Sequence, residues 1–181
     1  MSETKKLEFR KLRAHEIDCR IGQIKAGSGL SLLLYKDARA DMSLLDETVG
    51  PMNWKREHTR ENRNCIVSIY DEDKREWISK EDTGTESSNE AEKGLASDSF
   101  KRACVNWGIG RELYTAPFIW VKAEDCNITT GNSGRPTCRD KFVVVKLTYK
   151  KNGDIDGLAI KNTKNGKLVF TQMPTEKEEK K

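Results

Sequence analysis

Three short strand patterns followed by one long amphipathic helix constrain this chain more than any other feature. Residues 54–60, 65–70 and 76–80 read as three short strands, and the polar turn segments 61–64 and 71–74 separate them. Connections this short predict an antiparallel meander, because parallel strands need a crossover of a dozen residues or more. We therefore expect a sheet with the next helix packed on it.

The helix after the third strand carries signals at both ends. The segment 87–90 has the pattern of a capping box, and Gly108 supplies a C-terminal stop. At about 100° per residue, Lys101 and Arg102 lie away from the apolar side of the helix and are expected to face outward. That apolar side, which we expect on the sheet, consists of Ala96, Phe100, Ala103, Cys104 and Trp107.

Further elements flank this core. Residues 17–21 and 30–35 read as strands around a turn at 27–29, which predicts an N-terminal hairpin. Asp37 is placed to cap a helix over 38–49 that Gly50-Pro51 ends. The apolar residues Met42, Leu45 and Val49 form one stripe of that helix, which we expect to face the protein core.

The C-terminal part predicts β-structure again. Residues 142–149 and 158–161 flank an Asn152-Gly153 turn, which is typical of a hairpin, and 168–170 adds one short strand. Residues 124–140 read as a polar loop. The fold class predicted is α+β: an antiparallel β-meander packed on a long helix, a β-β-β-α core, with an N-terminal hairpin and a C-terminal β-hairpin.

A length of 181 residues fits one domain, which we place at 1–172 with its core at 37–121. Residues 173–181 have almost no apolar side chain to bury and are predicted to form a disordered charged tail. No apolar run approaches the roughly 20 residues that a bilayer helix needs, so no membrane partner is expected. Five cysteines without a C-x-x-C pair favour a reducing interior, and we expect a cytoplasmic protein of a bacterial cell.

Charge is unevenly distributed along the chain. The net charge is +4 over residues 1–40, −6 over 41–90, +1 over 91–140 and +5 over 141–181. A basic beginning and end around an acidic middle fit a polyanionic partner, and they fit an ordinary solvated surface as well.

Motifs of nucleotide or metal chemistry are missing from the sequence. There is no phosphate-binding loop, and Gly108-Ile109-Gly110 ends a helix where a dinucleotide site would begin one. His15 and His58 belong to different elements, and Cys126 and Cys138 read as free thiols, so no metal and no cofactor are expected. The acids of 71–92 fit either a metal-dependent nuclease or solubilising turns between exposed strands. They are Asp71, Asp73, Glu76, Asp82 and Glu86.

Several segments together resemble a known family. They are the helix end Gly50-Pro51-x-x-Trp54, the segments 31–39 and 108–114, and the helix at 92–108 with its Lys101-Arg102-Ala103 triplet. The chain resembles single-strand annealing proteins of the Rad52 type, and more closely the compact versions carried by phages and prophages of Gram-positive bacteria. The resemblance covers residues 7–120, about two thirds of the chain.

The resemblance implies a β-β-β-α core that assembles into rings or helical filaments with single-stranded DNA in an outer basic groove. The paired cations of the long helix touch the DNA backbone in that family, and here they are Lys101 and Arg102. A basic residue of the preceding helix contributes, for which Arg39 is the nearest match. Eukaryotic relatives carry one more basic residue a turn later, where this chain has Val105.

Elementary electrostatics agrees, because outward cations of identical copies add up along an oligomer. Lys55, Arg56 and Arg60 are candidates for the same track, although neighbours on a strand alternate faces, so Lys55 and Arg56 cannot both point into it. The alternative for Lys101 and Arg102 is a solvated helix face with Asp98 as ion-pair partner.

The predicted function is ATP-independent binding and annealing of single-stranded DNA in homologous recombination and repair, without catalysis. The expected partners are single-stranded DNA, further copies of this chain, and an exonuclease or a single-strand-binding protein of the host. Two alternatives stay open: a metal-dependent nuclease, and an accessory protein that binds DNA without annealing it. Trp107 is expected to pack on the sheet, whereas Trp54, Trp77, Tyr114 and Trp120 fit either base stacking or contact with a neighbouring subunit.

Overall fold

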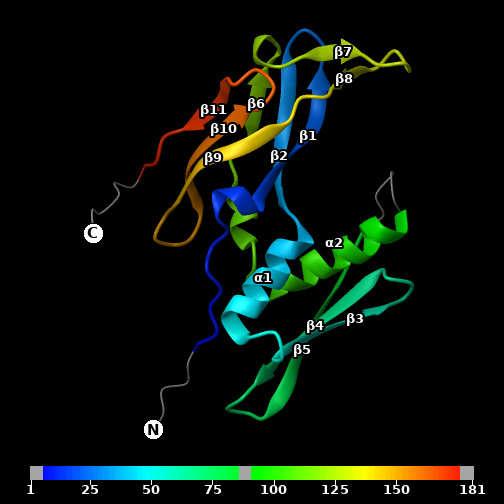
Figure 1. The fold of residues 1–181 in the computed structure, drawn as a ribbon, viewed down its shortest axis with the longest axis vertical. Helices are drawn as coiled ribbons and strands as arrows, with labels where there is room; N and C mark the ends of the chain where they lie inside the picture. Colours follow the sequence, from blue (N-terminus) through cyan, green and yellow to red (C-terminus); the bar gives the residue numbers. More distant parts are fainter. Residues whose placement is uncertain (1–5, 86–90, 176–181) are drawn as a thin grey trace. The chain divides into compact units, whose positions relative to one another are not determined.

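The computed structural model describes residues 6–85 and 91–175, and these form two compact units. Unit 1 comprises residues 1–11 and 36–111, and unit 2 comprises residues 12–35 and 112–181. Figure 1 shows the order of the elements in each unit. The predicted capping box at 87–90 lies outside the described residues. No helix within the described ranges is both long and apolar enough to cross a membrane.

Unit 1 contains the predicted antiparallel meander. Its strands run in the order β3-β4-β5, with the register pairs Trp54↔Ile69 and Ile69↔Ile78 across the sheet. The strands are β3 (Trp54–Thr59), β4 (Asn64–Asp71) and β5 (Glu76–Thr83). The central strand is the most buried, because Cys65, Val67 and Ile69 are at most 4% exposed. The α+β class and the meander are thereby confirmed.

Helix α2 (Ala91–Asn106) covers one face of this sheet. Phe100, Ala103 and Cys104 are fully buried, as the apolar stripe predicts. Trp107 donates its indole N–H to the carbonyl of Val67 at 3.0 Å, so its predicted packing role is confirmed. Gly108 has a φ of 102°, and the N–H groups of Gly108 and Ile109 return to the carbonyls of Val105 and Cys104, which ends the helix.

Helix α1 (Ala38–Val49) begins and ends at the predicted residues. The Asp37 carboxylate accepts the Arg39 backbone N–H at 2.8 Å, and Gly50 ends the helix with a φ of 85°. Its buried face differs from the predicted stripe: Leu44 and Leu45 are fully buried, whereas Met42 and Val49 are half-buried. The buried face of α1 also includes Ala40 and Asp41. Hydrophobic periodicity could not predict this face, because it assigns a carboxylate such as that of Asp41 to the surface.

Unit 2 is built on a six-stranded antiparallel sheet in the order β11-β10-β9-β1-β2-β6. Its strands are β1 (Ile17–Lys25), β2 (Gly29–Lys36), β6 (Ile119–Lys122), β9 (Phe142–Tyr149), β10 (Ile155–Asn162) and β11 (Leu168–Gln172). The β1–β2 and β9–β10 pairs are the predicted N-terminal and C-terminal hairpins, which are confirmed. Leu30, Leu32, Val121, Leu158 and Ile160 supply its core, each at most 3% exposed.

Two parts of unit 2 differ from the sequence-based expectation. The segment 124–140, expected as a loop, contains a turn at Ala123–Asp125 and a two-stranded sheet of β7 (Ile128–Thr130) and β8 (Pro136–Cys138). Thr175, within the predicted disordered tail, donates its hydroxyl to Asp156 at 2.6 Å. Residues 176–181 lie outside the described chain, and the single domain over 1–172 stays a prediction.

Gly29 sets the distance between β2 and β6. A Cβ at this position would lie 2.1 Å from the carbonyl oxygen of Val121 and 2.9 Å from the indole nitrogen of Trp120. We expect Gly29→Ala to lower the free energy of unfolding by about 3 kcal/mol, because backbone atoms must separate to admit the methyl group. Urea titration of both proteins measures this.

Gly27→Ala is the matched control for this substitution. Both glycines have a positive φ, 153° at Gly29 and 71° at Gly27, but a Cβ added at Gly27 would have no other atom within 4 Å. Gly27→Ala is expected to lower the free energy of unfolding by only about 1–2 kcal/mol, the cost of a left-handed backbone at a non-glycine residue. Equal destabilisation by the two substitutions would contradict the steric explanation.

Candidate nucleic-acid interface

Arg39 of α1 and Lys101 of α2 both stabilise the charged carboxylate of Asp37. The Arg39 guanidinium donates from Nε to the Asp37 carboxylate at 3.0 Å, and its side chain is 85% exposed. These hydrogen bonds hold the pKa of Asp37 below its usual range, and the positive charge of Lys101 lowers it further. Two of the predicted site residues, from two different helices, therefore act electrostatically on the same carboxylate.

A buried ion pair lies next to the backbone of Lys101. The Lys36 ammonium donates to the carboxylate of Asp41 and, at 3.3 Å, to the backbone carbonyl of Lys101. Both side chains are at most 4% exposed, and the second carboxylate oxygen of Asp41 has no hydrogen-bond partner. Burial raises the pKa of Asp41 to about 6, against the opposing effect of Lys36. The pair links α1 to the turn of α2 that carries Lys101.

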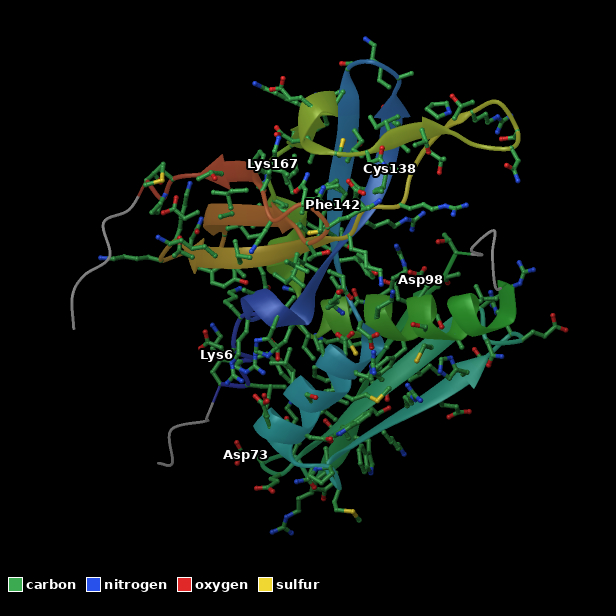
Figure 2. The ribbon with its side chains drawn as sticks, turned by 45° about the horizontal axis from the view of Figure 1, so that its top comes forward. Lys6, Asp73, Asp98, Cys138, Phe142 and Lys167 are labelled. Carbon is green, nitrogen blue, oxygen red and sulfur yellow. The ribbon has the colours of Figure 1, made fainter. Side chains whose placement is uncertain are left out.

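Arg102 lies on another side of α2, toward the sheet. Its Nε is 3.3 Å from the Asp82 carboxylate of β5, and its side chain remains 45% exposed. Asp98, the ion-pair partner under the alternative interpretation, accepts the backbone N–H and hydroxyl of Thr85. Figure 2 labels Asp98 on α2. Helix spacing could not show the Asp82 partner of Arg102, because that residue lies on the neighbouring strand.

Arg111 is a cation that the sequence analysis missed. Its guanidinium donates to the carbonyls of Val105 and Asn106, at 2.8 and 2.9 Å, and the side chain is exposed. It therefore completes the C-terminus of α2, where a positive charge is favourable. The guanidinium thus reaches the backbone of Val105, the position at which the resemblance implies one more cation. The position of Arg111 three residues after Gly108, the glycine that ends the helix, is the sequence signal that would have identified it.

The strand cations do not gather on one surface. Arg56 lies on the helix-covered face of the sheet, its Cζ 4.8 Å from the ring centre of Phe100. Lys55 lies on the opposite face, with its ammonium 4.5 Å from the ring centre of Trp77. Arg60, expected as the last residue of the strand, instead follows it in a turn where its φ is 50°. Strand alternation thus separates Lys55 from Arg56, as the period of two requires.

The acids that raised the nuclease alternative are scattered. Asp73 lies in the turn between β4 and β5 (Figure 2), Asp71 and Glu76 form a register pair beside it, and Asp82 holds Arg102. Glu86 is outside the described residues. Among the residues that are described, no group of three His, Cys, Asp or Glu side chains is arranged to hold a metal ion.

The histidines and the cysteine pair have ordinary surroundings. His15 is exposed, and His58 has its Nδ1 3.4 Å from the Ser99 hydroxyl, where burial lowers its pKa. Cys126 and Cys138 are free thiols, as expected. Burial raises the pKa of Cys126 to about 11, and the neighbouring Cys138 adds to this effect, so the thiol stays protonated at neutral pH.

Comparison with known proteins gives two matches. The sequence profile of the Rad52/22 family double-strand break repair protein matches residues 4–130. The single-stranded DNA-binding protein DdrA of Deinococcus radiodurans is 33% identical over 115 residues, which cover 62% of this chain. The chain spans 55% of the length of that relative. No solved structure gave a significant match.

Proposed function

Because this chain belongs to the Rad52/22 family, we propose that it binds single-stranded DNA and anneals complementary strands in recombination and repair. The relative from Deinococcus radiodurans, a single-stranded DNA-binding protein, supports the binding part of this proposal. In the proposed mechanism, several copies act together as a ring or filament. The reaction needs no nucleotide hydrolysis and no cofactor.

The observation that carries this proposal is that Arg39, through hydrogen bonds, and Lys101, through its charge, both stabilise the carboxylate of Asp37. One cation belongs to each helix, and in our proposal a DNA phosphate replaces this carboxylate as their partner. Arg102 and Arg111 extend the cationic side chains along α2 toward its C-terminus. Contacts to phosphates carry no sequence preference, which annealing of arbitrary sequences requires.

The role of such a protein is kinetic. Duplex formation is downhill by about 1.4 kcal/mol per base-pair step from stacking alone. Repulsion between two polyanions and hairpins within each strand slow it. Cations that neutralise phosphates and hold a strand extended remove both obstacles, and nucleotide hydrolysis is unnecessary for a downhill step.

The proposal is tested by mixing complementary oligonucleotides with and without the purified protein. An annealing protein accelerates duplex formation, whereas a plain binding protein protects the strands from pairing. Incubation of the protein with labelled DNA and Mg²⁺ tests the nuclease alternative. Cleavage products would support a nuclease and contradict our proposal. Sedimentation with DNA tests the assembly: large particles are expected, and a monomer under all conditions would contradict a ring or filament.

Asp82→Asn tests the role of the acid beside Arg102. Asp82 competes with phosphate for the guanidinium at 3.3 Å, so removing its charge is expected to raise affinity for single-stranded DNA about two- to five-fold at low salt. Fluorescence anisotropy with a labelled oligonucleotide measures the change. Asp154→Asn, which removes an equal charge from the β9–β10 turn, should leave affinity unchanged; a gain of the same size there would indicate bulk charge only.

The expected partners are single-stranded DNA and, in a bacterial cytoplasm, an exonuclease that exposes the strand or a host protein that coats it. Both proteins would meet this chain at DNA ends.

A further inference from the structure

Unit 2 exposes an aromatic surface that the cationic site of unit 1 does not explain. Phe118 is 76% exposed and Leu33 57%. The rings of Phe118 and Trp120 stack with centroids 6.2 Å apart and an interplanar angle of 20°. We call the surface formed by Leu33, Tyr35, Phe118 and Trp120 the aromatic face. Exposed apolar groups gathered on one face mark a binding surface.

The sheet itself arranges this face. The register pairs Ser31↔Trp120 and Leu32↔Ile119 place Ile119 and Leu32 in the core, and strand alternation turns Trp120 to the other side. Continued by one residue, this register sets Leu33 opposite Phe118. Gly29 leaves room for the Trp120 indole, and Gly22 of β1 leaves Leu33 uncovered on its other flank.

Charge identifies the kind of partner. Unit 2 has 16 Lys and Arg against 11 Asp and Glu, a net charge of +5, whereas unit 1 has 17 against 18 and a net charge of −1. Strand alternation puts Arg20 on the same side of β1 as Gly22, and Lys122 on the same side of β6 as Trp120. Aromatic rings beside cations, on a positively charged unit, fit a polyanion that carries planar groups.

We propose that the aromatic face stacks unpaired bases of single-stranded DNA, a contact separate in chemistry from the phosphate contacts of α1 and α2. The inference rests on the proposed function, and it assigns the bases of the DNA strand to unit 2. A base stacked on Phe118 keeps its Watson–Crick edge free for a complementary strand. Stacking accepts every base, because each has a π face.

The test compares two probes that have equal charge, a fluorescent oligo(dT) and an abasic oligomer with the same number of phosphates. Phe118→Leu keeps an apolar side chain but removes the ring. It is expected to weaken oligo(dT) binding at least about five-fold and to leave abasic binding unchanged. Phe118→Trp, which keeps a ring, should retain oligo(dT) affinity. Unchanged abasic binding also shows that the variants are folded.

Each other outcome overturns the inference. Equal oligo(dT) affinity of Phe118→Leu and the parent protein excludes stacking on this ring. Equal loss on both probes excludes a contact specific to bases, because a lost stacking contact weakens only the probe that carries them. Smaller assemblies in sedimentation, with an unchanged ratio of the two affinities, would assign the face to contact between copies of the chain. Failure of the proposed function looks different, because the parent protein would then bind neither probe.

Discussion

Replacing Lys101 and Arg102 together by alanine is expected to weaken binding of single-stranded DNA by roughly 10- to 100-fold at low salt. Each lost phosphate contact also lowers the slope of log affinity against log salt by about 0.7 on single strands, so the slope should fall by about 1.4. Arg102 is exposed and Lys101 is half-buried, and neither belongs to the buried stripe at Phe100, Ala103 and Cys104 that packs on the sheet. The fold should therefore survive. Anisotropy titrations at several salt concentrations measure affinity and slope together.

The matched control is Lys150→Ala with Lys151→Ala, an equal loss of charge in the β9–β10 turn. Only a small change in affinity is expected there, because general electrostatic attraction is screened over about 10 Å at 0.1 M salt. If the control pair weakens binding as much as the Lys101 and Arg102 pair, the site is not on α2. A slope that stays the same in the α2 variant would lead to the same conclusion.

Lys36→Met is expected to lower the free energy of unfolding by about 3–5 kcal/mol at pH 8, although the new side chain is apolar and of similar length. The reason is Asp41, which is fully buried and already has one unpartnered carboxylate oxygen. Without Lys36 its charge is buried without its hydrogen-bonded counter-ion, and the more weakly acting charge of Lys101 is left to oppose the burial. The double variant Lys36→Met/Asp41→Asn should recover about 2 kcal/mol or more, since no buried charge remains. Urea titrations of the three proteins measure these differences.

The pH dependence of the Lys36→Met variant gives an independent check. Asp41 has a folded-state pKa of about 6, above its usual 3.8, so folding favours its protonated form. Its contribution to stability is complete below about pH 4 and is lost as the pH rises through 6. Loss of Lys36 moves that pKa higher still. The deficit of Lys36→Met relative to the parent protein should therefore shrink between pH 8 and pH 5, and a constant deficit would contradict the assigned cause.

Much of unit 1 follows from local sequence signals. Asp37, Gly50 and Gly108 mark helix ends by capping chemistry that needs only neighbouring residues, and the structure has helix ends there. The meander is also local, because each strand pairs with the next through a short turn. The strands within 124–140 could not be predicted, because strands of three residues have no readable periodicity.

The sequence could predict residues of the candidate site, but not which residues form ion pairs and hydrogen bonds with them. The sequence placed Lys101 and Arg102 on the outer side of a helix, and it offered Asp98 as the neighbour one turn away. The partner that Arg102 has is Asp82, from a strand 20 residues earlier. Arg111 was missed because its link to α2 depends on the chain turning back at Gly108.

The sequence by itself determined the cap of α1 at Asp37, the C-terminal end of α2 and the meander, because hydrophobic period and capping act between residues a few positions apart. Only the tertiary structure decided that Lys36 and Asp41 form a buried pair next to the Lys101 carbonyl, that Arg39 and Lys101 both stabilise the Asp37 carboxylate, and that the rings of Phe118 and Trp120 stack on each other. The first two of these interactions join residues on different elements. Their energies depend on burial and distance, which exist only once the chain has folded.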